Sequence, residues 1–482
     1  MEYKTTIGLE IHVELNTESK MFCSCKNDPL EKRPNFNICP VCTAQPGTLP
    51  VANEQAIRKT IKAGLALGCK INKESKFDRK NYFYPDLPKG YQISQYDKPF
   101  CEKGFLQIDN KNIGITRIHL EEDTGRLIHS GKDSLVDYNR AGVPLMEMVT
   151  EPDINSGKKA RNFAQEIQII FRYLNISSAD MEKGQMRVEV NISLSKNEKL
   201  GTKVEIKNLN SFRVVEKAID YEIARQSEVL DDGEKVVQET RGWDEKKQIT
   251  VSQREKEEAH DYRYFPEPDL PTFRFDDDYI AEIKAEIPEL PWAKRIRLRD
   301  EYGLEDDSTI ENFVYNKDLG EYFEKVMSEL TSWLGKKDQK ITNLAVNYII
   351  TDFWALFEKA PIEELERKVD PEDFAELIKM IYKEEISSKI AKQVLSEMFE
   401  SGADPSHIVE EKKLVQMTDT NEIGKIIKEV IDNNPKPVED YKKGKENALQ
   451  YLAGQVMAAT RGRAKPETVQ EILKEQLKQQ NP

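Results

Sequence analysis

The sequence predicts an α+β domain followed by an all-α domain and a small all-α tail. Strand-like alternation and helical periodicity interleave up to about residue 291, and only helical periodicity follows. Five prolines gather in Pro266–Pro291, at the change between the two regimes. Because 482 residues exceed what one hydrophobic core organises, about two to four domains are expected. We place them at residues 1–292, 293–404 and 405–482.

The first domain should contain well-defined strands and helices. Thr6–Leu15 alternates between apolar and polar side chains, as a half-buried strand does, and Met186–Leu194 repeats the pattern. Helical periodicity runs through Asn53–Leu67, whose first residue suits an N-cap and which Gly68 should end. A second helix is expected over Gly157–Leu174, with its aromatic and aliphatic side chains on one face.

The later part of the chain should be helical. Pro266–Pro291 is expected to be a boundary, since proline continues neither a helix nor a central strand. Beyond it, apolar residues such as Val346, Ile350 and Phe353 recur at helical spacing, and Phe357 continues the series. A second break at residues 401–405 should introduce the tail, in which loops separate short helices.

Composition restricts the class of protein. A formal charge of −14 argues against a protein that coats nucleic acid non-specifically, although a confined basic patch could still bind tRNA. No apolar run approaches the ~20 residues that a membrane helix needs, and the first residues lead directly into a strand pattern without a signal peptide. We therefore expect a cytoplasmic protein that does not bind membranes.

Acidic residues cluster at three places where strands are expected. On the polar side of the first strand, successive side chains lie about 6.6 Å apart. The residues in question are Glu10, His12 and Glu14 in the first strand, Glu121, Glu122 and Asp123 after a second apolar run, and Glu147 and Glu151 near a third. Carboxylates held close together need a cation, and Mg²⁺ fits oxygen ligands and nucleotide phosphates, while a histidine ligand would also suit Mn²⁺. A solvated acidic surface explains the same residues equally well.

A nucleotide site, if present, would have to use metal and isolated basic residues. The sequence contains neither a P-loop nor a GxGxxG fingerprint. The segment 77–90 offers cationic and aromatic side chains for phosphates and rings, namely Arg79, Lys80, Tyr82, Tyr84 and Lys89. An ordered surface loop could have the same composition.

Four of the six cysteines form a compact set. Cys23 and Cys25 are followed by Cys39 and Cys42. Two thiolate pairs on short loops match tetrahedral Zn²⁺ coordination, and four protein ligands leave no open position, so the zinc would be structural. Free or partly oxidised thiols are the alternative.

Basic residues surround a corner in the tail. Arg461, Arg463 and Lys465 follow an apparent helix, which Gly462 can end. Exposed cations at such a corner could bind RNA phosphates. A solubilising turn would have the same residues.

Long motifs make the chain resemble the B subunits of bacterial glutamyl/aspartyl-tRNA amidotransferases. They occur in one order along nearly the whole chain. They include IGLEIHVEL (residues 7–15), YFYPDLPKGYQISQYDKP (82–99), HLEEDTGR (119–126), DYNRAGVPLMEMVTEPD (137–153), MRVEVNISL (186–194), GTKVEIKNLNSF (201–212), ETRGWDE (239–245), DYRYFPEPDLP (261–271) and GQVMAATRGRAKP (454–466). So many motifs in one order make chance similarity a poor explanation.

The resemblance implies an architecture and a reaction. It implies a catalytic cradle with a core like that of glutamine synthetase and guanidino kinases, then a helical domain and a tail. It implies an ATP-dependent carbon–nitrogen ligase that uses Mg²⁺ to phosphorylate the side chain of Glu-tRNA(Gln) or Asp-tRNA(Asn) and then forms the amide. Ammonia would come from a glutaminase A subunit, and a small C subunit would complete a heterotrimer.

The resemblance also assigns residues. Glu10 and His12 would belong to the metal site and catalysis, with Glu121, Glu122 and Glu147 as companions and Glu151 as a further candidate. The segment with Arg79, Lys80, Tyr82, Tyr84 and Lys89 would lie near the nucleotide and the ammonia route. The corner residues Arg461, Arg463 and Lys465 would contact tRNA, and the complete set Cys23, Cys25, Cys39 and Cys42 implies zinc.

Two other classes of function fit the residues. One is a non-catalytic tRNA-binding adaptor, and the other is a standalone ATP-dependent carboxylate–amine ligase that does not use RNA. The acidic clusters separate the adaptor from a catalytic transamidase, which alone of the two needs them. The basic tail separates the RNA-independent ligase from the transamidase, which would use the tail to bind tRNA. The chain shows no amidase serine signature, so we expect that it cannot use glutamine by itself.

Overall fold

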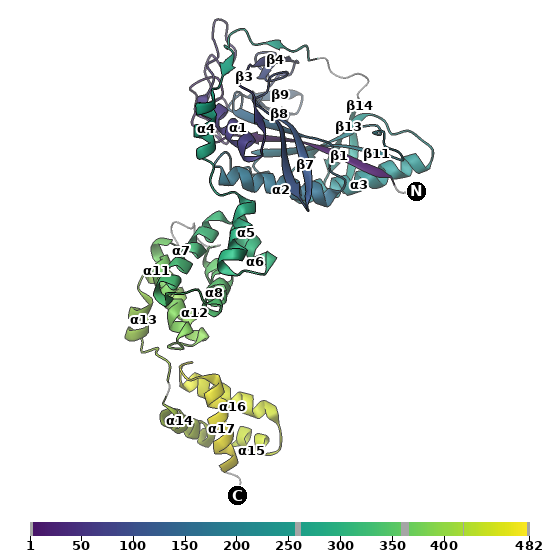
Figure 1. Cartoon of the computed structure of the whole chain (residues 1–482). Coiled ribbons are helices and arrows are strands. Elements are labelled where there is room, and N and C mark those ends of the chain that lie inside the picture. Colours follow the sequence, from purple (N-terminus) through teal and green to yellow (C-terminus); the bar gives the residue numbers. More distant parts are fainter. Residues whose placement is uncertain (1–2, 256–261, 358–365, 418, 480–482) are drawn as a thin grey trace. The chain divides into compact units, whose positions relative to one another are not determined.

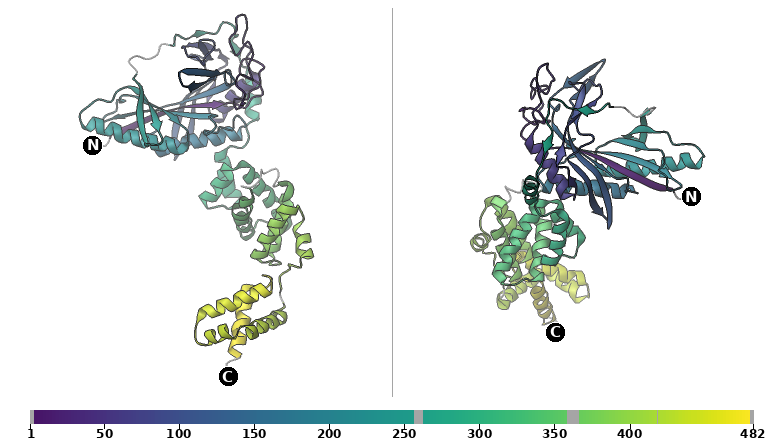
Figure 2. Two further views of the ribbon diagram at one scale, coloured as in Figure 1. Left: turned by 180° about the vertical axis from the view of Figure 1, so that it is seen from behind. Right: turned by 45° about the horizontal axis from the view of Figure 1, so that its top comes forward.

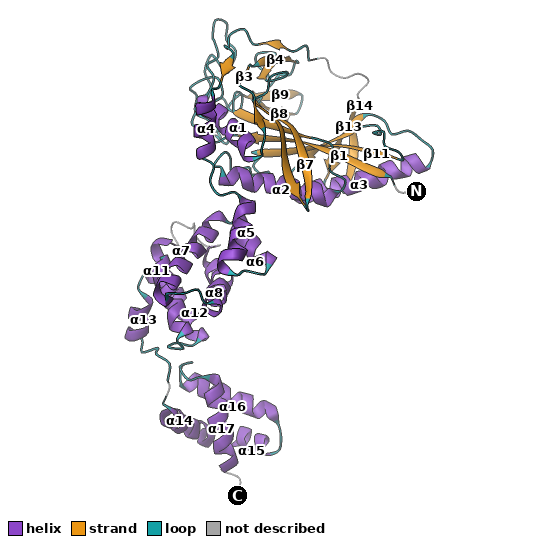
Figure 3. Cartoon of the chain, in the orientation of Figure 1, coloured by secondary structure: helices purple, strands orange, loops and turns teal. Residues whose placement is uncertain are grey.

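The computed structural model describes residues 3–255, 262–357, 366–417 and 419–479. The chain forms two compact units, Met1–Pro291 and Trp292–Pro482. Among the described residues, every named strand belongs to the first unit, whereas the second is helical (Figure 3). The predicted α+β region followed by a helical region is therefore confirmed.

The centre of the first unit is a nine-stranded sheet (Figure 1). Its middle strand β1 (Lys4–Glu14) pairs with β11 (Met186–Ser195) and β10 (Pro144–Thr150), both antiparallel to it. Of the strand pairs in this sheet, β12 and β13 run parallel. The order is β14 (Ile249–Glu255), β13 (Glu239–Asp244), β12 (Val204–Leu209), β11, β1, β10, β7 (Lys111–Glu122), β6 (Cys101–Ile108) and β2 (Lys70–Ile71).

The two faces of this sheet have opposite character. Along β1, Ile7, Leu9 and Ile11 are buried in the main hydrophobic cluster, together with side chains of α2 (Gly157–Tyr173) and α3 (Phe212–Asp231). These two helices lie along one face of the sheet (Figures 1 and 2). Because side chains alternate along a strand, the residues between the buried ones project from the opposite face, which we call the polar face.

Local sequence signals determine the helices well. α1 (Glu54–Ala66) begins after Asn53, whose side chain accepts a hydrogen bond from the backbone N–H of Ala56, and Gly68 follows it with φ +67°. α2 begins at Gly157 as predicted, after Ser156 as N-cap. The strand and helix predictions for residues 6–15, 186–194, 53–67 and 157–174 are therefore confirmed within two residues.

Smaller elements surround the main sheet. A three-stranded sheet joins β4 (Asp78–Asn81) to β5 (Tyr91–Ser94) and β15 (Phe265–Pro266). A hairpin is formed by β8 (Arg126–Ser130) and β9 (Asp133–Asp137), while β3 (Glu74–Ser75) pairs with β16 (Phe273–Arg274).

The proline-rich stretch is more ordered than a simple boundary. It contains α4 (Asp277–Ala285), which lies in its proline-free part and begins at the N-cap Asp276. A run without proline can form a helix between flanking prolines, and the division of the chain into its two units falls at Pro291, the end of this stretch. Asp261, the first residue of the DYRYFPEPDLP motif, lies outside the described residues.

In its described residues, the second unit is helical and includes one irregular helical segment. A π-helix, η1 (Ile349–Phe353), joins α8 (Gln339–Tyr348) to α9 (Trp354–Phe357), where one regular helix was expected. The other helices of its first part are α5 (Pro291–Tyr302), α6 (Asp307–Tyr315), α7 (Lys317–Leu334), α11 (Pro371–Tyr382), α12 (Ser388–Ser401) and α13 (Pro405–Glu411). No described helix is long and apolar enough to cross a membrane.

The last four helices share a hydrophobic cluster of their own. It begins at Met417 and ends at Leu477, whereas α13 packs against α11 and α12. The helices are α14 (Thr420–Asn433), α15 (Pro435–Lys442), α16 (Glu446–Ala459) and α17 (Pro466–Gln479). The division of the helical region into domains at residue 404 stays a prediction.

Candidate active site and metal centre

A row of ionisable side chains crosses the polar face of the sheet. The antiparallel register places His12 of β1 opposite Glu147 of β10, and Glu147 opposite His119 of β7. Directly opposed residues in antiparallel strands have Cβ atoms about 4.5–5.5 Å apart, so the register itself brings these three side chains together. Glu121 follows His119 on the same face of β7, two residues later.

These residues form a compact group of metal-ligating atoms. Ligand atoms of His12, Glu121 and Glu147 lie within 4.8 Å of one another. The Glu147 carboxylate oxygen Oε2 lies 3.4 Å from His12 Nε2 and 3.3 Å from His119 Nε2. Two carboxylates and an imidazole suit Mg²⁺ or Mn²⁺. We call His12, Glu121 and Glu147 the carboxylate–histidine cluster.

The charges of this cluster and of the adjacent His119 shift one another's pKa values. Burial lowers the pKa of His119, but the carboxylates of Glu147 and Glu121 outweigh this and raise it to about 9. For Glu147, burial raises the pKa, whereas His119 and His12 together hold it well below its usual range. His119 is 3% exposed, and among the described residues its Nδ1 atom has no hydrogen-bond partner. A buried group with opposed charges and an unsatisfied nitrogen is typical of a binding site.

Lys80 adds a cation at the edge of the cluster. Burial lowers the pKa of Lys80, but the carboxylates of Glu121 and Glu147 outweigh this effect and raise the pKa above its usual value. The lysine therefore stays charged beside them. Its Nζ atom lies 5.3 Å from the ring centre of Tyr262 and 6.0 Å from that of Tyr82. An ammonium group beside ligating carboxylates suits contact with a phosphate group.

The adjacent residue Arg79 points elsewhere. Its Nε and Nη2 atoms donate to the two carboxylate oxygens of Glu267 at 2.8 and 2.9 Å, and its guanidinium lies 4.2 Å from the ring centre of Tyr91. Tyr82 donates to the side-chain oxygen of Gln92 at 3.1 Å. Tyr84 remains 55% exposed. Of the five predicted nucleotide residues, Lys80 is therefore the one whose charge faces the cluster.

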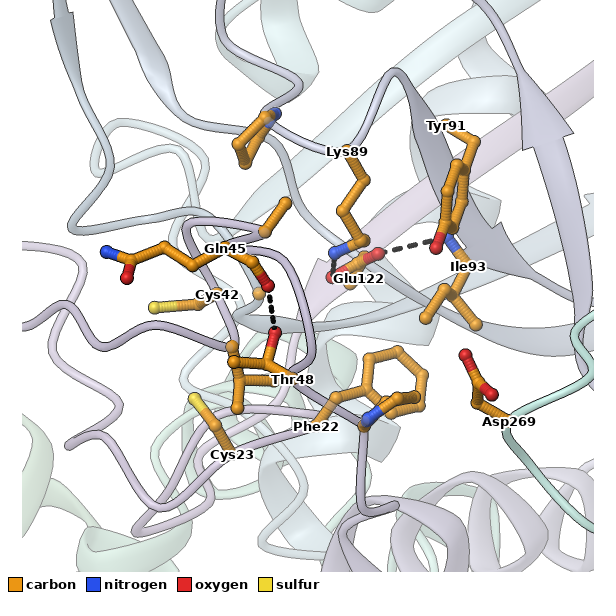
Figure 4. A pocket seen from close by; sticks show the side chains of 15 residues that line it. Phe22, Cys23, Cys42, Gln45, Thr48, Lys89, Tyr91, Ile93, Glu122 and Asp269 are labelled. Atoms are coloured by element: carbon orange, nitrogen blue, oxygen red, sulfur yellow. Dashed lines mark hydrogen bonds and ion pairs between the residues drawn. The ribbon is translucent and has the colours of Figure 1, made fainter.

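Glu122 projects from the face opposite to Glu121. Its Oε2 atom accepts a hydrogen bond from Lys89 Nζ at 2.7 Å, and its Oε1 atom accepts one from the backbone N–H of Ile93 at 3.0 Å. This pair lines a pocket of about 250 Å³ that also includes Cys23 and Cys42 (Figure 4).

The remaining predicted ligands also lie outside the cluster. Glu10 accepts from the Asn191 amide at 2.8 Å, and its ligand atom lies within 4.8 Å of those of Glu189 and Glu205. Glu151 is exposed and accepts from the Thr116 hydroxyl at 2.7 Å, beyond a register shift in β10. The structure thus gathers three of the six predicted metal residues and places the other three in different surroundings.

Sequence reasoning missed several members of the site. His119 opens the HLEEDTGR motif and alternates with Glu121, a signal that could have identified it. Tyr264 lies near Lys80, and burial raises the pKa of its phenol to about 12. Glu189 and Glu205 join Glu10 only through strand pairing, which no local pattern reveals.

The four clustered cysteines meet in a separate loop of the first unit. Their Sγ atoms all lie within 4.8 Å of one another, and they are free thiols. The backbone N–H of Cys39 donates to Cys42 Sγ at 3.2 Å. The thiol of Cys23 and the nearby Lys20 lower the pKa of Cys42 to about 5, although burial opposes this. Four convergent sulfurs at this spacing could bind a metal and fit Zn²⁺.

The basic corner of the tail is partly engaged within the second unit. Lys465 pairs with Glu384, and the backbone oxygen of Arg463 accepts a hydrogen bond from the backbone N–H of Met417 at 2.9 Å. Arg461 is exposed and has φ +53°. Arg461 is therefore the member of the predicted set whose side chain is most accessible.

Comparison with known proteins identifies the family of the chain. The GatB/GatE catalytic domain family matches residues 5–281, and the GatB domain family matches residues 321–477. Relatives named as the B subunit of aspartyl/glutamyl-tRNA(Asn/Gln) amidotransferase occur in Caldicellulosiruptor saccharolyticus and Thermotoga maritima. These proteins are 50% and 49% identical to this chain, respectively, over 99% of both chains. The relative from Persephonella marina is 50% identical over 99% of this chain and 100% of its own.

Both domain families match in the expected order, and the full-length identities are far above what family membership requires. The motifs from residue 7 to residue 466 fall within or beside the matched segments. The chain therefore belongs to the GatB family of B subunits of tRNA-dependent amidotransferases.

Proposed function

We propose that this protein phosphorylates the side-chain carboxylate of Glu-tRNA(Gln) or Asp-tRNA(Asn) with ATP and converts it to the amide. The carboxylate–histidine cluster beside Lys80 is the observation that carries this proposal. It offers ligands for a cation and a positive charge for a phosphate on one face of the sheet. The protein would thus be an ATP-dependent carbon–nitrogen ligase that acts in protein biosynthesis.

The chemical problem is that a carboxylate repels nucleophiles and has no usable leaving group. Mg²⁺, when bound, would offset the charge of the phosphates during transfer from ATP. His12, Glu121 and Glu147 would hold this ion, and Lys80 would orient the phosphate. The sheet would hold both substrates in position, which supplies much of the rate enhancement.

Ammonia must reach the activated carboxylate without a proton, because ammonium has no lone pair for attack. We propose that the pocket around Lys89 and Glu122 belongs to the ammonia route. The pair provides a hydrogen-bond donor and an acceptor on the side of β7 opposite to the cluster. Ammonia would come from a glutaminase A subunit, and a small C subunit would complete a heterotrimer in the cytoplasm.

The remaining assignments complete the proposal. The four cysteines would bind structural Zn²⁺. The basic corner of the tail would contact tRNA, chiefly through the exposed side chain of Arg461. The core of the first unit would share its fold with glutamine synthetase and guanidino kinases. The relatives' name, which includes both tRNA(Asn) and tRNA(Gln), supports both substrates.

The test compares variants of the cluster with matched surface variants. In His12→Ala and Glu147→Gln, ATP-dependent amide formation on mischarged tRNA should fall by about 10³-fold while tRNA binding persists. His129→Ala and Glu198→Gln alter exposed residues and should behave like the wild type. Turnover that is unchanged in both cluster variants would refute the kinase assignment and favour a tRNA-binding adaptor.

A second measurement separates this function from an RNA-independent ligase. Free glutamate and aspartate replace the mischarged tRNA, with ammonium as the nitrogen source. We expect no amide without tRNA. Efficient amidation of a free amino acid would identify the protein as a standalone carboxylate–amine ligase.

A further inference from the structure

Lys20 is a lysine with no exposed surface in the loop that carries the cysteines. A buried ammonium group is costly unless its charge and all its N–H donors are satisfied. Its Nζ atom donates to the backbone oxygen of Asn37 at 2.8 Å and to that of Tyr138 at 3.2 Å, and it lies 3.8 Å from Cys42 Sγ. Three N–H donors thus meet three acceptors, two in the cysteine loop and one at Tyr138.

The acceptors of Lys20 lie in the cysteine loop and in the turn 138–142. Asn37 belongs to the loop between the two cysteine pairs, and Tyr138 begins the turn 138–142. Asn139 of the same turn is also buried, and its side-chain oxygen accepts from the backbone N–H groups of Phe36 and Asn37 at 2.7 and 2.9 Å. Lys20 and Asn139 therefore attach the cysteine loop to the turn 138–142.

Charge gives Lys20 a second role. Four thiolates around a divalent cation leave a net charge of about −2 in a partly buried site. Cys42 receives the Lys20 ammonium on one side and the backbone N–H of Cys39 on another. Such outer contacts hold ligands in orientation and typically change metal affinity about 10–100-fold.

We propose that Lys20 is the buried counter-charge of the cysteine metal site and connects metal binding to the turn 138–142. This inference rests on the proposed zinc site. Lys20 acts as a positioning residue, since it lies behind the sulfur ligands and not among them.

The cysteine loop and the turn 138–142 both contribute residues to the pocket that contains Lys89 and Glu122. Cys23, Cys42 and Gly142 all line this pocket (Figure 4). Gly142 donates its backbone N–H to the Asp123 oxygen at 2.9 Å and accepts from the backbone N–H of Met21 at 2.7 Å. The metal site and the turn thus form one continuous wall, so a change at Lys20 should alter both.

The first experiment measures metal retention in the full-length chain. Zinc content per chain and the rate of zinc transfer to a chromogenic chelator are compared in the wild type, Lys20→Gln and Lys20→Arg. We expect Lys20→Gln to release zinc about 10–100-fold faster, and Lys20→Arg to restore part of the retention because it keeps the charge. Lys26→Gln is the matched control, since Lys26 lies in the same loop but has an exposed side chain paired with Asp28.

The outcomes separate this inference from the proposal on which it rests. Wild-type release kinetics in Lys20→Gln would overturn the role of Lys20 and leave the zinc site intact. A wild-type chain that binds no zinc would overturn both, while the proposed phosphoryl transfer would still stand.

The second experiment needs only the wild-type chain and so does not depend on how Lys20→Gln folds. Amide hydrogen exchange is compared before and after zinc is removed by the chelator. We expect faster exchange in the cysteine loop and at Gly142 and Val143, whose N–H groups donate to the backbone oxygens of Asp123 and Arg140. An exchange rate in the turn that does not respond to zinc removal would overturn the proposed connection.

Discussion

Neighbouring residues in a strand can have opposite roles, and Arg79 and Lys80 illustrate this. Arg79 is fixed by the buried carboxylate of Glu267, whereas Lys80 faces Glu121 and Glu147 of the polar face. Their composition alone suggests that both bind phosphate. The alternation of β4 assigns one to stability and the other to the site.

Substitution of Arg79 should therefore lower stability, whereas substitution of Lys80 should lower turnover. Arg79→Ala leaves the buried Glu267 unpaired and should lower the free energy of unfolding by about 2–4 kcal/mol. Lys80→Met should keep the melting temperature near that of the wild type and reduce ATP-dependent turnover by about 10²–10³-fold. Thermal unfolding and steady-state kinetics of both variants check this. A stable Arg79→Ala or a fully active Lys80→Met would contradict the assignment.

The residue types of the site could be predicted from the sequence, but their grouping could not. The alternation of residues 6–15 placed Glu10 and His12 on one face. Whether Glu121 or Glu122 joins them depends on the register of β7 against β10, which is set by long-range pairing. The same pairing brings in His119 and separates Glu151.

At the scale of elements, local capping signals were reliable and helix irregularities were not. Asn53 and Ser156 begin their helices through side-chain hydrogen bonds that the sequence pattern implies. The π-helix η1 buries Ile349 and Phe353. Their spacing also fits a regular α-helix, so hydrophobic periodicity cannot reveal the π-helix. The short helix α4 escaped notice because its flanking prolines dominate the pattern.

Helix α11 and the N-cap residue of α13 bring acidic side chains together, and this predicts a pH-dependent stability. Ligand atoms of Asp373, Glu376 and Asp404 lie within 4.8 Å of one another. Burial, followed by Asp370 and Asp404, raises the pKa of Asp373 to about 6. A raised carboxyl pKa in the folded state contributes stability below the unfolded pKa, and this contribution is lost as pH rises through about 6.

Asp373→Asn should therefore gain stability relative to the wild type at pH 8 but not at pH 4, by less than about 1 kcal/mol because the group is partly solvated. Glu372→Gln is the matched control for the helix dipole, since it removes an exposed carboxylate from the same first helical turn, and its charge raises the pKa of Asp373 less than burial, Asp370 and Asp404 do. Melting temperatures of both variants between pH 4 and 8 test this. A difference between the two variants that does not change with pH would contradict the prediction.

At the scale of the whole molecule, the candidate functional groups are divided between the two compact units. The cluster, the cysteine loop and the pocket of Lys89 all belong to the unit Met1–Pro291. The last four helices have their own hydrophobic cluster and the basic corner. This division predicts that substrate binding and bond formation can be altered independently.

Removal of residues 419–482 tests that independence. The truncation keeps α13 with the helices against which it packs and removes the tail helices. The apparent Michaelis constant for mischarged tRNA should rise about tenfold or more, because the proposed tail contact with the tRNA is lost, while turnover at saturating tRNA changes little. An unchanged Michaelis constant would show that the tail does not bind tRNA.

The most direct test of the central claim is to observe a cation at the carboxylate–histidine cluster. Mn²⁺ is titrated into the full-length chain with ATP and followed by electron paramagnetic resonance, with electron spin echo modulation to detect a nitrogen ligand. We predict a bound Mn²⁺ with an imidazole nitrogen in the wild type and in Glu198→Gln, loss of the nitrogen signal in His12→Ala, and weakened binding in Glu147→Gln. Unaltered Mn²⁺ binding and an unaltered nitrogen signal in both cluster variants would contradict the account.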